Sequence, residues 1–376
     1  MVRWRRISRP PQTVTSETTL YLNPIGLLSG DAAVAALDCG AGRSLAGGRL
    51  AFTAVEVLLR ESGEVTAFIA PFAEVEAMAG AAETLSRLSA PRPSLCGIPM
   101  DRPAIMGVVN VTPDSFSDGG DCVDPHAAIA QGRALAEAGA HIIDIGGEST
   151  RPGSDPVALE LELDRVLPVV RALAADGLTV SIDSRHASVM AAALTAGAAL
   201  VNDVSALTFD PDSLGVVAGR GAPVALMHSR GDPKTMQDNP QYDCAPLDVF
   251  DYLEARIDAC LAAGVARANI IVDPGIGFGK SPTGHNIEIL QRLGLLHGLG
   301  CPLLLGVSRK GFIDRLAGAQ DPKQRLPGSL AAGLAGLDKG VQILRVHDVA
   351  ETTQALAVWR ALTADLNHEQ SPDPTG

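Results

Sequence analysis

The sequence has few aromatic residues and no apolar stretch of membrane-spanning length. Phe, Trp and Tyr make up 3% of the 376 residues, whereas 46% are hydrophobic, so the core must be built from Ala, Val, Ile and Leu. No apolar run reaches the roughly 18 residues that cross a bilayer. The basic start, MVRWRRISRPPQ, lacks the apolar segment of a secretory signal. We therefore expect a cytoplasmic protein without a membrane partner.

Paired cysteines and an excess of positive charge are also missing. The six cysteines are scattered, without a Cys-x-x-Cys pair or a Cys/His cluster, which indicates a reduced protein without structural zinc. The 30 Lys and Arg residues against 43 Asp and Glu residues give a net charge of −13, which argues against a nucleic-acid partner. An anionic ligand must therefore be bound by local hydrogen-bond donors.

Short apolar runs alternate with Ala/Leu-rich amphipathic stretches from about Ile105 to Trp359. The runs are IMGVVNV, HIIDIGG, TVSIDS, LVNDVSA, PVALMHS, IIVDPGIG, PLLLGVS and ILRVHD. Such continuously apolar strands are buried on both faces, which is typical of a parallel sheet. Eight strand–helix units over about 255 residues favour an α/β fold of the closed (β/α)8 TIM barrel type. The rival doubly wound fold would need a Gly-rich dinucleotide loop after a strand, and the sequence has none.

The rest of the chain divides into three further segments. We expect a disordered basic tail over residues 1–17 and a loose C-terminal tail over residues 364–376, on either side of the folded part. Residues 18–98 differ in pattern from the barrel, which we expect over residues 99–363. They predict an extra small N-terminal α/β segment, whose default role is to pack against the barrel or a partner.

Each predicted strand ends in a polar group. In TIM barrels the loops that follow the strands converge at one face and build the active site there. A single buried Asp at a strand end is often only a helix cap, but eight converging polar ends are harder to explain in that way. They are Asn110, Asp144, Asp183, Asn202 with Asp203, His228, Asp273, Ser308–Arg309–Lys310, and Arg345 with His347.

These groups form two chemical sets. One set offers hydrogen-bond acceptors, which suit the N–H edge of a flat heterocycle: Asp144, Asp183, Asn202 and Asp273. The other offers donors and positive charge, which suit phosphate or carboxylate oxygens: Arg151, Lys310, Arg345 and His347. Together they predict a site for a nitrogen heterocycle that carries a phosphorylated arm.

Three loops have a distinctive composition. VTPDSFSDGGD, from Val111, and GESTRPGSDP, from Gly147, are rich in Gly, Ser, Pro and Asp, as expected of lids that close over a substrate; ordinary surface loops are the alternative. GIGFGKS, from Gly275, is similar to a phosphate-binding loop. That pattern requires Gly where Pro274 stands, so the match fails.

In combination the motifs resemble those of the dihydropteroate synthase family. They are GVVNVTPDSFSDGG, HIIDIGGESTRPG, SIDS, ND at Asn202, MHSRG, VDPGIGFGK, GVSRKGF, PGSLAA and RVHDV, in family order. The resemblance implies a Mg²⁺-dependent transferase of folate biosynthesis, a homodimer and a sulfonamide target. It would condense 6-hydroxymethyl-7,8-dihydropterin diphosphate with p-aminobenzoate by an SN1-like substitution, giving 7,8-dihydropteroate and pyrophosphate. A methyltetrahydrofolate methyltransferase-like barrel and a non-catalytic pterin-binding paralogue are the alternatives.

The resemblance also implies residue roles. Asn110 would bind Mg²⁺, and four residues would be catalytic: Lys310, Asp183, Asp273 and Arg151. The pterin would contact Asp183, Asn202 and Asp273, with Met227 on its ring and Asp144 lining the pocket. Arg345, His347 and Arg151 would hold the diphosphate. Phe278, Thr150, Pro152 and Lys310 would surround p-aminobenzoate, and Asp114 and Phe116 would belong to the first mobile loop. Many family members have a hydroxyl residue where this chain has Gly311, so here a backbone N–H is expected to serve the carboxylate instead.

Overall fold

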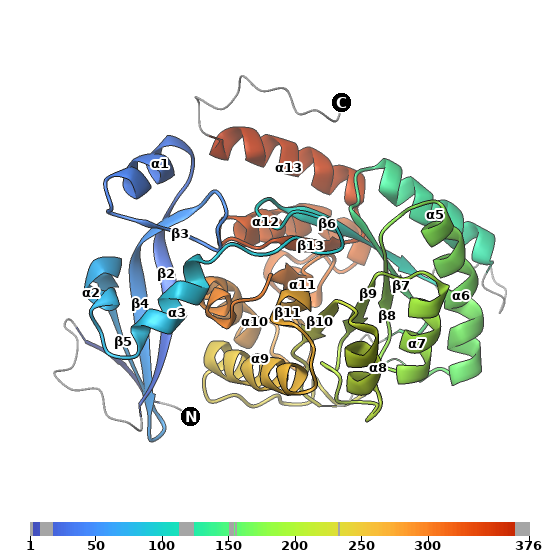
Figure 1. The fold of residues 1–376 in the computed structure, drawn as a ribbon, viewed down its shortest axis with the longest axis horizontal. Coiled ribbons are helices and arrows are strands. Elements are labelled where there is room, and N and C mark those ends of the chain that lie inside the picture. The colour runs from blue at the N-terminus through green and yellow to red at the C-terminus, as the bar shows by residue number, and fades with distance from the viewer. Residues whose placement is uncertain are drawn as a thin grey trace.

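The structure is a computed structural model that describes residues 3–7, 18–112, 124–149, 154, 156–231 and 234–364. It has two units that lie side by side (Figure 1), a small N-terminal sheet with three helices and a larger α/β barrel. None of the helices in these described ranges is long and apolar enough to cross a membrane.

Eight parallel strands form the barrel. They are β6 (Ala104–Asn110), β7 (Ile142–Gly146), β8 (Val180–Asp183), β9 (Leu200–Asp203), β10 (Val224–Met227), β11 (Ile270–Asp273), β12 (Leu304–Leu305) and β13 (Ile343–Val346). Their order is β11-β10-β9-β8-β7-β6-β13-β12, and a parallel bridge between Val272 and Leu303 closes the ring. Seven strands lie within the apolar runs and β6 begins one residue before its run, and β7 to β11 are buried throughout. The predicted TIM barrel is confirmed.

Helices cover the outside of the barrel (Figure 1). They are α5 (Pro125–Glu137), α6 (Leu159–Ala175), α7 (Ala187–Ala196), α8 (Ser213–Arg220), α9 (Ala245–Ala262), α10 (His285–Gln291), α11 (Gly311–Ala317), α12 (Leu326–Leu337) and α13 (Val349–Thr363), with 3-10 turns η1 (Arg267–Asn269), η2 (Leu293–Leu299) and η3 (Pro322–Arg325). Gly197 ends α7 in the left-handed conformation, where a Cβ would lie 2.7 Å from the Ala174 methyl group. Glycine therefore lets the chain turn back into the next strand.

The N-terminal unit is a mixed sheet. Strands β2 (Thr19–Leu28), β4 (Ala51–Glu61) and β5 (Glu64–Pro71) are antiparallel neighbours, β3 (Arg43–Ser44) pairs with β4, and the helices are α1 (Gly30–Asp38), α2 (Phe72–Glu76) and α3 (Ala81–Ser89). The predicted small α/β segment is therefore confirmed. Strand β1 (Arg3–Arg6) runs parallel to β5, so the prediction of a disordered tail over residues 1–17 was wrong there. The free edge of β5 offers backbone groups that pair regardless of side-chain pattern.

The boundary between the two units also differs from the prediction. Leu95 is 1% exposed and packs with Met100 and the first residues of the barrel strands, among them Ile142 and Ile343. This cluster closes the end of the barrel at which the strands begin. The barrel unit therefore starts near Leu95 and not at residue 99.

Candidate active site

A buried group of acceptors lies where β7, β8 and β9 meet. Asp144 is 0% exposed, and its Oδ2 accepts hydrogen bonds from Asn202 Nδ2 at 3.0 Å and from Arg345 Nε at 2.7 Å. Arg345 Nη2 reaches Asp183 Oδ2, also at 2.7 Å. Residues from four strands are thus joined, because the closed barrel brings β13 next to β6 and close to β7 and β8.

The sequence predicts a set of acceptors and a separate set of cationic groups. In the structure, however, Arg345 of the second set is bonded directly to the acceptors. The guanidinium uses Nε and Nη2 on the two carboxylates, and its third nitrogen, Nη1, forms no hydrogen bond with any described residue. One carboxylate oxygen each of Asp144 and Asp183, Oδ1, is buried without a hydrogen-bond partner in the described part of the chain. These atoms can pair with a ligand that enters the site.

Burial and charge shift the pKa values of this group in opposite ways. Burial raises the pKa of Asp183 from 3.8 to about 7, although the Arg345 guanidinium lowers it. Burial also lowers the pKa of Arg345, but the carboxylates of Asp144 and Asp183 outweigh this effect and raise it above its ordinary value. Arg345 therefore remains charged, and Asp183 can exchange a proton near neutral pH.

Asp273 and Lys310 lie on the neighbouring side of the site. Asp273 ends β11, and its Oδ1 accepts the N–H of Gly275 at 2.7 Å. Burial raises the pKa of Asp273, while that hydrogen bond and the charge of Lys310 lower it. Lys310 Nζ lies 4.1 Å from the centre of the Phe278 ring, which is a cation–π contact. The structure therefore brings Asp273, Lys310 and Phe278 together, as the sequence predicts.

Lys280 holds the loop after β11 in place. From the sequence this residue was considered only as part of a phosphate-binding loop, and its structural role was not predicted. Lys280 is 0% exposed, and its Nζ donates to the carbonyl oxygens of Gly275 (2.8 Å), Phe278 (2.9 Å) and His228 (3.1 Å) and lies 2.8 Å from His228 Nδ1. Burial lowers the pKa of His228 and of Lys280. The alternating glycines were the signal for this loop, since a Cβ at Gly275 would lie 1.9 Å from the His228 oxygen.

Two of the predicted polar strand ends have structural roles. His228 binds Lys280, and Asp203 accepts the N–H groups of Ser205 (2.7 Å) and Leu207 (2.9 Å). Asp203 is therefore a cap for the loop after β9, which is the alternative that the sequence left open for any single Asp.

At β13 the strand end is fastened to the loop after β12. Ser308 Oγ lies 3.0 Å from His347 Nδ1 and accepts the backbone N–H of the same residue at 3.2 Å, and Arg309 pairs with Asp348. Ser308 is only 6% exposed. The contact with Ser308 therefore orients the His347 ring. We do not interpret the two residues as a nucleophile and its base.

Five predicted site residues lie outside the described ranges: Asp114, Phe116, Thr150, Arg151 and Pro152.

Met227 is 4% exposed at the end of β10, beside Gly275. Gly311 begins α11, and a Cβ there would meet no atom within 4 Å. The space beside Gly311 that a side chain would enter is thus open.

Asn110 is suited to the Mg²⁺ that the family resemblance implies. It is half-buried at the end of β6, level in strand register with Gly146, which is in turn level with Asp183. Mg²⁺ prefers oxygen ligands, keeps several waters and is held by few protein groups, most often carboxylates, together with substrate phosphates. A single amide oxygen at the mouth of the barrel fits this pattern.

Sequence comparison identifies the family. The profile of a family described as pterin binding enzymes matches residues 106–347. The dihydropteroate synthase of Neisseria meningitidis serogroup B is 46% identical over 275 residues, which cover 72% of this chain and 96% of that protein. The dihydropteroate synthase of Escherichia coli is 43% identical over 263 residues, which cover 70% of this chain and 92% of that protein.

Solved structures agree with the sequence comparison. A Xanthomonas albilineans dihydropteroate synthase with 4-aminobenzoic acid has a TM-score of 0.67 at 46% identity, over 73% of this chain and 96% of that one. The Yersinia pestis enzyme with a sulfonamide drug complex also has a TM-score of 0.67, at 43% identity over 72% and 98%. The Xanthomonas enzyme in complex with 7,8-dihydropteroate has 0.65, at 44% identity over 73% and 97%. The chain therefore belongs to the dihydropteroate synthase family of pterin-binding transferases.

Proposed function

We propose that this chain joins 6-hydroxymethyl-7,8-dihydropterin diphosphate to p-aminobenzoate at the carboxyl ends of its barrel strands, with the residue roles given below. The observation that carries these roles is the Asp144–Arg345–Asp183 group, in which one guanidinium is fixed between two buried carboxylates. It supplies hydrogen-bond acceptors for a heterocycle and a donor for an anion within one small site.

The pterin is held by the acceptor side. Asp183, Asn202 and Asp273 accept and donate hydrogen bonds along its N–H-rich edge, Asp144 lines the same pocket, and the Met227 side chain packs on its ring. The buried, partnerless Oδ1 atoms of Asp144 and Asp183 support this role, because leaving such acceptors unpaired is costly.

The diphosphate is held by the cationic side. Arg345 contributes Nη1, His347 contributes its ring, oriented by Ser308, and Arg151 joins from the second loop. Asn110 would hold Mg²⁺ through its amide oxygen. When bound, the ion supplies charge neutralisation on the pyrophosphate oxygens.

p-Aminobenzoate lies next to Lys310 and Phe278, with Thr150 and Pro152 on the second loop and Asp114 and Phe116 on the first. The cation–π contact of Lys310 with Phe278 supports a slot that accepts both an aryl ring and a carboxylate. The backbone N–H at Gly311 serves that carboxylate in place of a hydroxyl group.

Substitution proceeds without a covalent enzyme intermediate. The bond between the pterin methylene carbon and the diphosphate oxygen breaks, and its electron pair leaves with the pyrophosphate. Asp183 and Asp273 stabilise the delocalised pterin cation through their negative charge. The amine then forms the C–N bond and loses one proton to solvent.

Pyrophosphate release tests this proposal against its two alternatives. We expect release only when both the pterin diphosphate and p-aminobenzoate are present. A methyltransferase-like barrel would release no pyrophosphate. A non-catalytic paralogue would bind the pterin diphosphate but would not release pyrophosphate from it. Asp183→Ala and Asp273→Ala should each weaken pterin diphosphate binding by at least tenfold in calorimetric titration, from the loss of a charged hydrogen bond of about 1.5–3 kcal/mol.

The assembly that we propose is a cytoplasmic homodimer formed through the late barrel helices. Leu316 on α11 and Val358 and Leu362 on α13 are 59%, 58% and 80% exposed, and such exposed apolar side chains gather at interfaces. Sedimentation of the wild type and of Leu362→Glu with Val358→Glu tests it, and a monomeric wild type would contradict it.

A further inference from the structure

Two buried acidic side chains flank the second loop, one on each side. Glu148 follows β7 and is 7% exposed, and Glu162 lies in the first turn of α6 and is 0% exposed. Between them lie Thr150, Arg151 and Pro152, which are outside the described residues. Both described ends of this loop therefore carry a carboxylate that is largely shielded from water.

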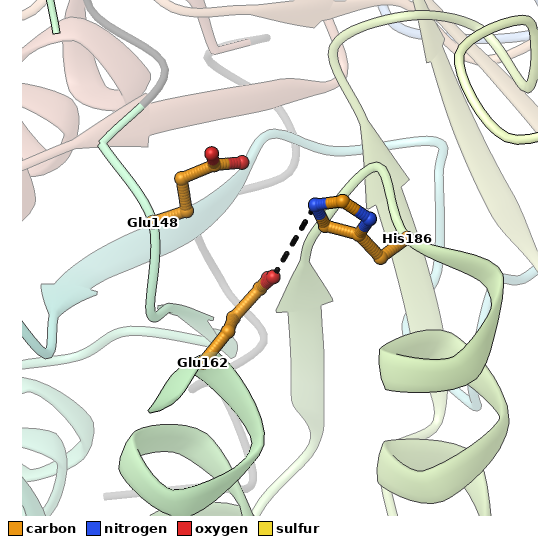
Figure 2. A group of neighbouring side chains, drawn as sticks. All are labelled: Glu148, Glu162 and His186. Carbon is orange, nitrogen blue, oxygen red and sulfur yellow. Dashed lines mark ion pairs between the residues drawn. The ribbon is translucent and has the colours of Figure 1, made fainter. Parts of the chain in front are cut away.

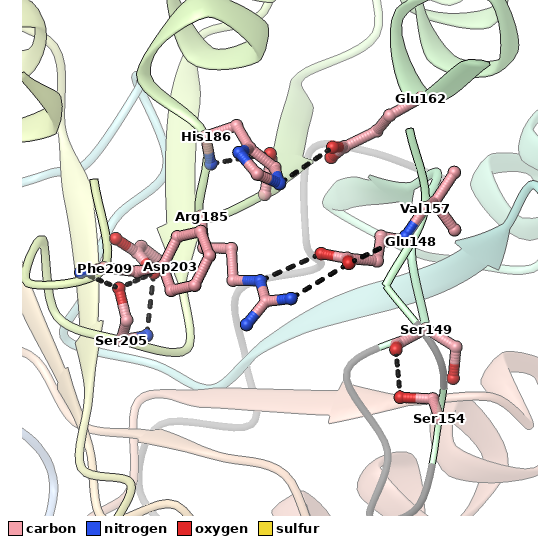
Figure 3. A network of polar contacts seen from close by, with 11 residues as sticks. Glu148, Ser149, Ser154, Val157, Glu162, Arg185, His186, Asp203, Ser205 and Phe209 are labelled. Carbon is pink, nitrogen blue, oxygen red and sulfur yellow. Dashed lines mark hydrogen bonds and ion pairs between the residues drawn. The ribbon is translucent and has the colours of Figure 1, made fainter. Parts of the chain in front are cut away.

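Two consecutive basic residues face these carboxylates. Arg185 Nε and Nη2 lie 3.0 Å from Glu148 Oε2 and Oε1, and His186 Nε2 lies 3.8 Å from Glu162 Oε2. Figure 2 shows the two glutamates and the imidazole turned toward one another, and Figure 3 shows the paired guanidinium. Arg185 follows Asp183, the last residue of β8, by two positions.

Arg185 is itself held in place. Its Cζ lies 4.0 Å from the centre of the Phe209 ring, and the His186 ring meets the same ring edge-on at 5.3 Å. The backbone N–H of Phe209 donates to Ser205 Oγ at 3.2 Å, and Ser205 Oγ donates to Asp203 at 2.7 Å (Figure 3). A chain of contacts therefore runs from the end of β9 to the guanidinium.

Glu148 also closes the loop on itself. Its Oε1 accepts the N–H of Val157 at 3.2 Å, so one carboxylate joins residues on the two sides of the loop. Arg165 of α6 donates to the carbonyl oxygen of Gly147 at 2.9 Å. Because Glu148 is bonded both to Arg185 and to the Val157 N–H, the Arg185 guanidinium stabilises the two sides of the loop through this one carboxylate.

A metal ion is the other cation that this cluster could hold. Ligand atoms of Glu148, Glu162 and His186 lie within 4.8 Å of one another. Both Glu148 oxygens, however, are already engaged by the fork of Arg185, and its positive charge repels a second cation at that carboxylate. The contacts therefore favour an ion-paired clamp.

We propose that Arg185 is a positioning residue. Through the Glu148 carboxylate, which also accepts the Val157 N–H, it fastens the described ends of the second loop to the end of β8 and so orients the side of the site that receives p-aminobenzoate. The inference rests on the proposed binding of p-aminobenzoate beside this loop. It ties the loop to the same strand end that carries Asp183, so the aryl amine and the pterin would be held in register with each other.

Steady-state pyrophosphate release by the full-length variants Arg185→Ala and Arg185→Lys tests the inference. For Arg185→Ala we expect the KM for p-aminobenzoate to rise about tenfold, with less than about a twofold change in the Kd of the pterin diphosphate. Arg185→Lys should recover part of the loss, because an ammonium group pairs with one carboxylate oxygen but not with both. Glu148→Gln, which keeps an acceptor for Val157, serves if Arg185→Ala does not fold.

Arg133→Ala is the matched control. Arg133 pairs with Asp176 at the opposite end of α6, at 2.8 Å, far along the helix from the loop. We expect this variant to leave both substrate constants unchanged. A rise in the KM for p-aminobenzoate equal to that of Arg185→Ala would overturn the inference.

Hydrogen exchange at the Val157 amide in the ligand-free protein gives a readout without turnover. It should be about tenfold faster in Arg185→Ala and unchanged in Arg133→Ala. Faster exchange without a change in the KM for p-aminobenzoate would overturn the link to the substrate, and unchanged exchange would overturn the clamp. Stoichiometric Zn²⁺ binding that persists in Arg185→Ala would also overturn it in favour of a metal site. A wild type without pyrophosphate release would instead contradict the proposed function.

Discussion

At the scale of single residues, the types of the site side chains could be predicted, but their pairing could not. The sequence indicates that Asp144, Asp183 and Arg345 lie at strand ends. Their joint contact depends on the closure of the barrel, which brings together residues about 200 positions apart. The same holds for Lys280, whose burial follows from the path of the loop and not from its local sequence pattern.

The raised pKa of Asp183 gives a pH-dependent prediction. Because burial raises this pKa to about 7, the carboxyl group of the free protein becomes neutral below that pH, and its charged contacts with Arg345 and with the pterin weaken. We expect kcat/KM for the pterin diphosphate to fall about tenfold per pH unit below about pH 7. Asp183→Asn should be less active and should lack this limb. A flat wild-type profile between about pH 5.5 and 8 would contradict the prediction.

The same shift has a consequence for stability, with a defined sign. Between the ordinary value of 3.8 and about 7, the folded state binds a proton at Asp183 that the unfolded chain has lost. The contribution of this group to the free energy of unfolding therefore falls as the pH rises through that window. The difference between wild type and Asp183→Asn in thermal unfolding at pH 5 and at pH 8 measures it.

The open space at Gly311 gives a prediction for p-aminobenzoate binding. A Cβ at this position meets no atom within 4 Å, so Gly311→Ser should fold normally. Its hydroxyl group would add a hydrogen bond to the p-aminobenzoate carboxylate, and we expect the KM for that substrate to fall about threefold, which corresponds to about 0.6 kcal/mol. Gly311→Ala is the control, and an equal effect of Ala would show that the hydroxyl group makes no contact.

At the scale of elements, the barrel strands were predictable and the edge of the small sheet was not. Strands buried on both faces, such as β8 and β10, have continuous apolar patterns that are visible in the sequence. Strand β1, RWRR, has no such pattern, since its pairing depends on the free backbone edge of β5. For the N-terminal unit, the sequence predicted only that it packs against the barrel or a partner, and no residue pattern indicated which surface it contacts.

The loop after β11 provides a prediction for an element. Lys280→Met keeps the apolar length of the side chain but removes the N–H donors from three carbonyl oxygens. Because the carbonyl oxygens of His228 and Gly275 are buried and would lose their donor, we expect a loss of about 3 kcal/mol in the free energy of unfolding, measured in urea. Lys323→Met, at an exposed position, is the control and should change it by less than about 0.5 kcal/mol.

At the scale of the whole molecule, the N-terminal unit is fastened to one side of the barrel. Arg60 pairs with Asp248 (2.6 Å) and Asp251 (2.7 Å) of α9, and Glu56 forms a two-point pair with Arg292 at 3.0 Å. Every residue of the turn η2 is buried, and this turn lies under the N-terminal unit. Removal of the unit would therefore expose apolar barrel surface, whereas the described site residues all lie after residue 109.

Two truncations separate the role of this unit from that of the segment which closes the barrel. A chain that starts at Ser94 keeps Leu95, and we expect it to retain kcat for pyrophosphate release per folded molecule, with a Tm lower by about 10 °C through the loss of the interface. A chain that starts at Pro99 also loses Leu95, which is 1% exposed at the closed end of the barrel. The resulting cavity should cost a further 2–5 kcal/mol or so. Size-exclusion chromatography before the assay restricts both measurements to monodisperse protein. A monodisperse chain from Ser94 without turnover would mean that the N-terminal unit contributes to the active site.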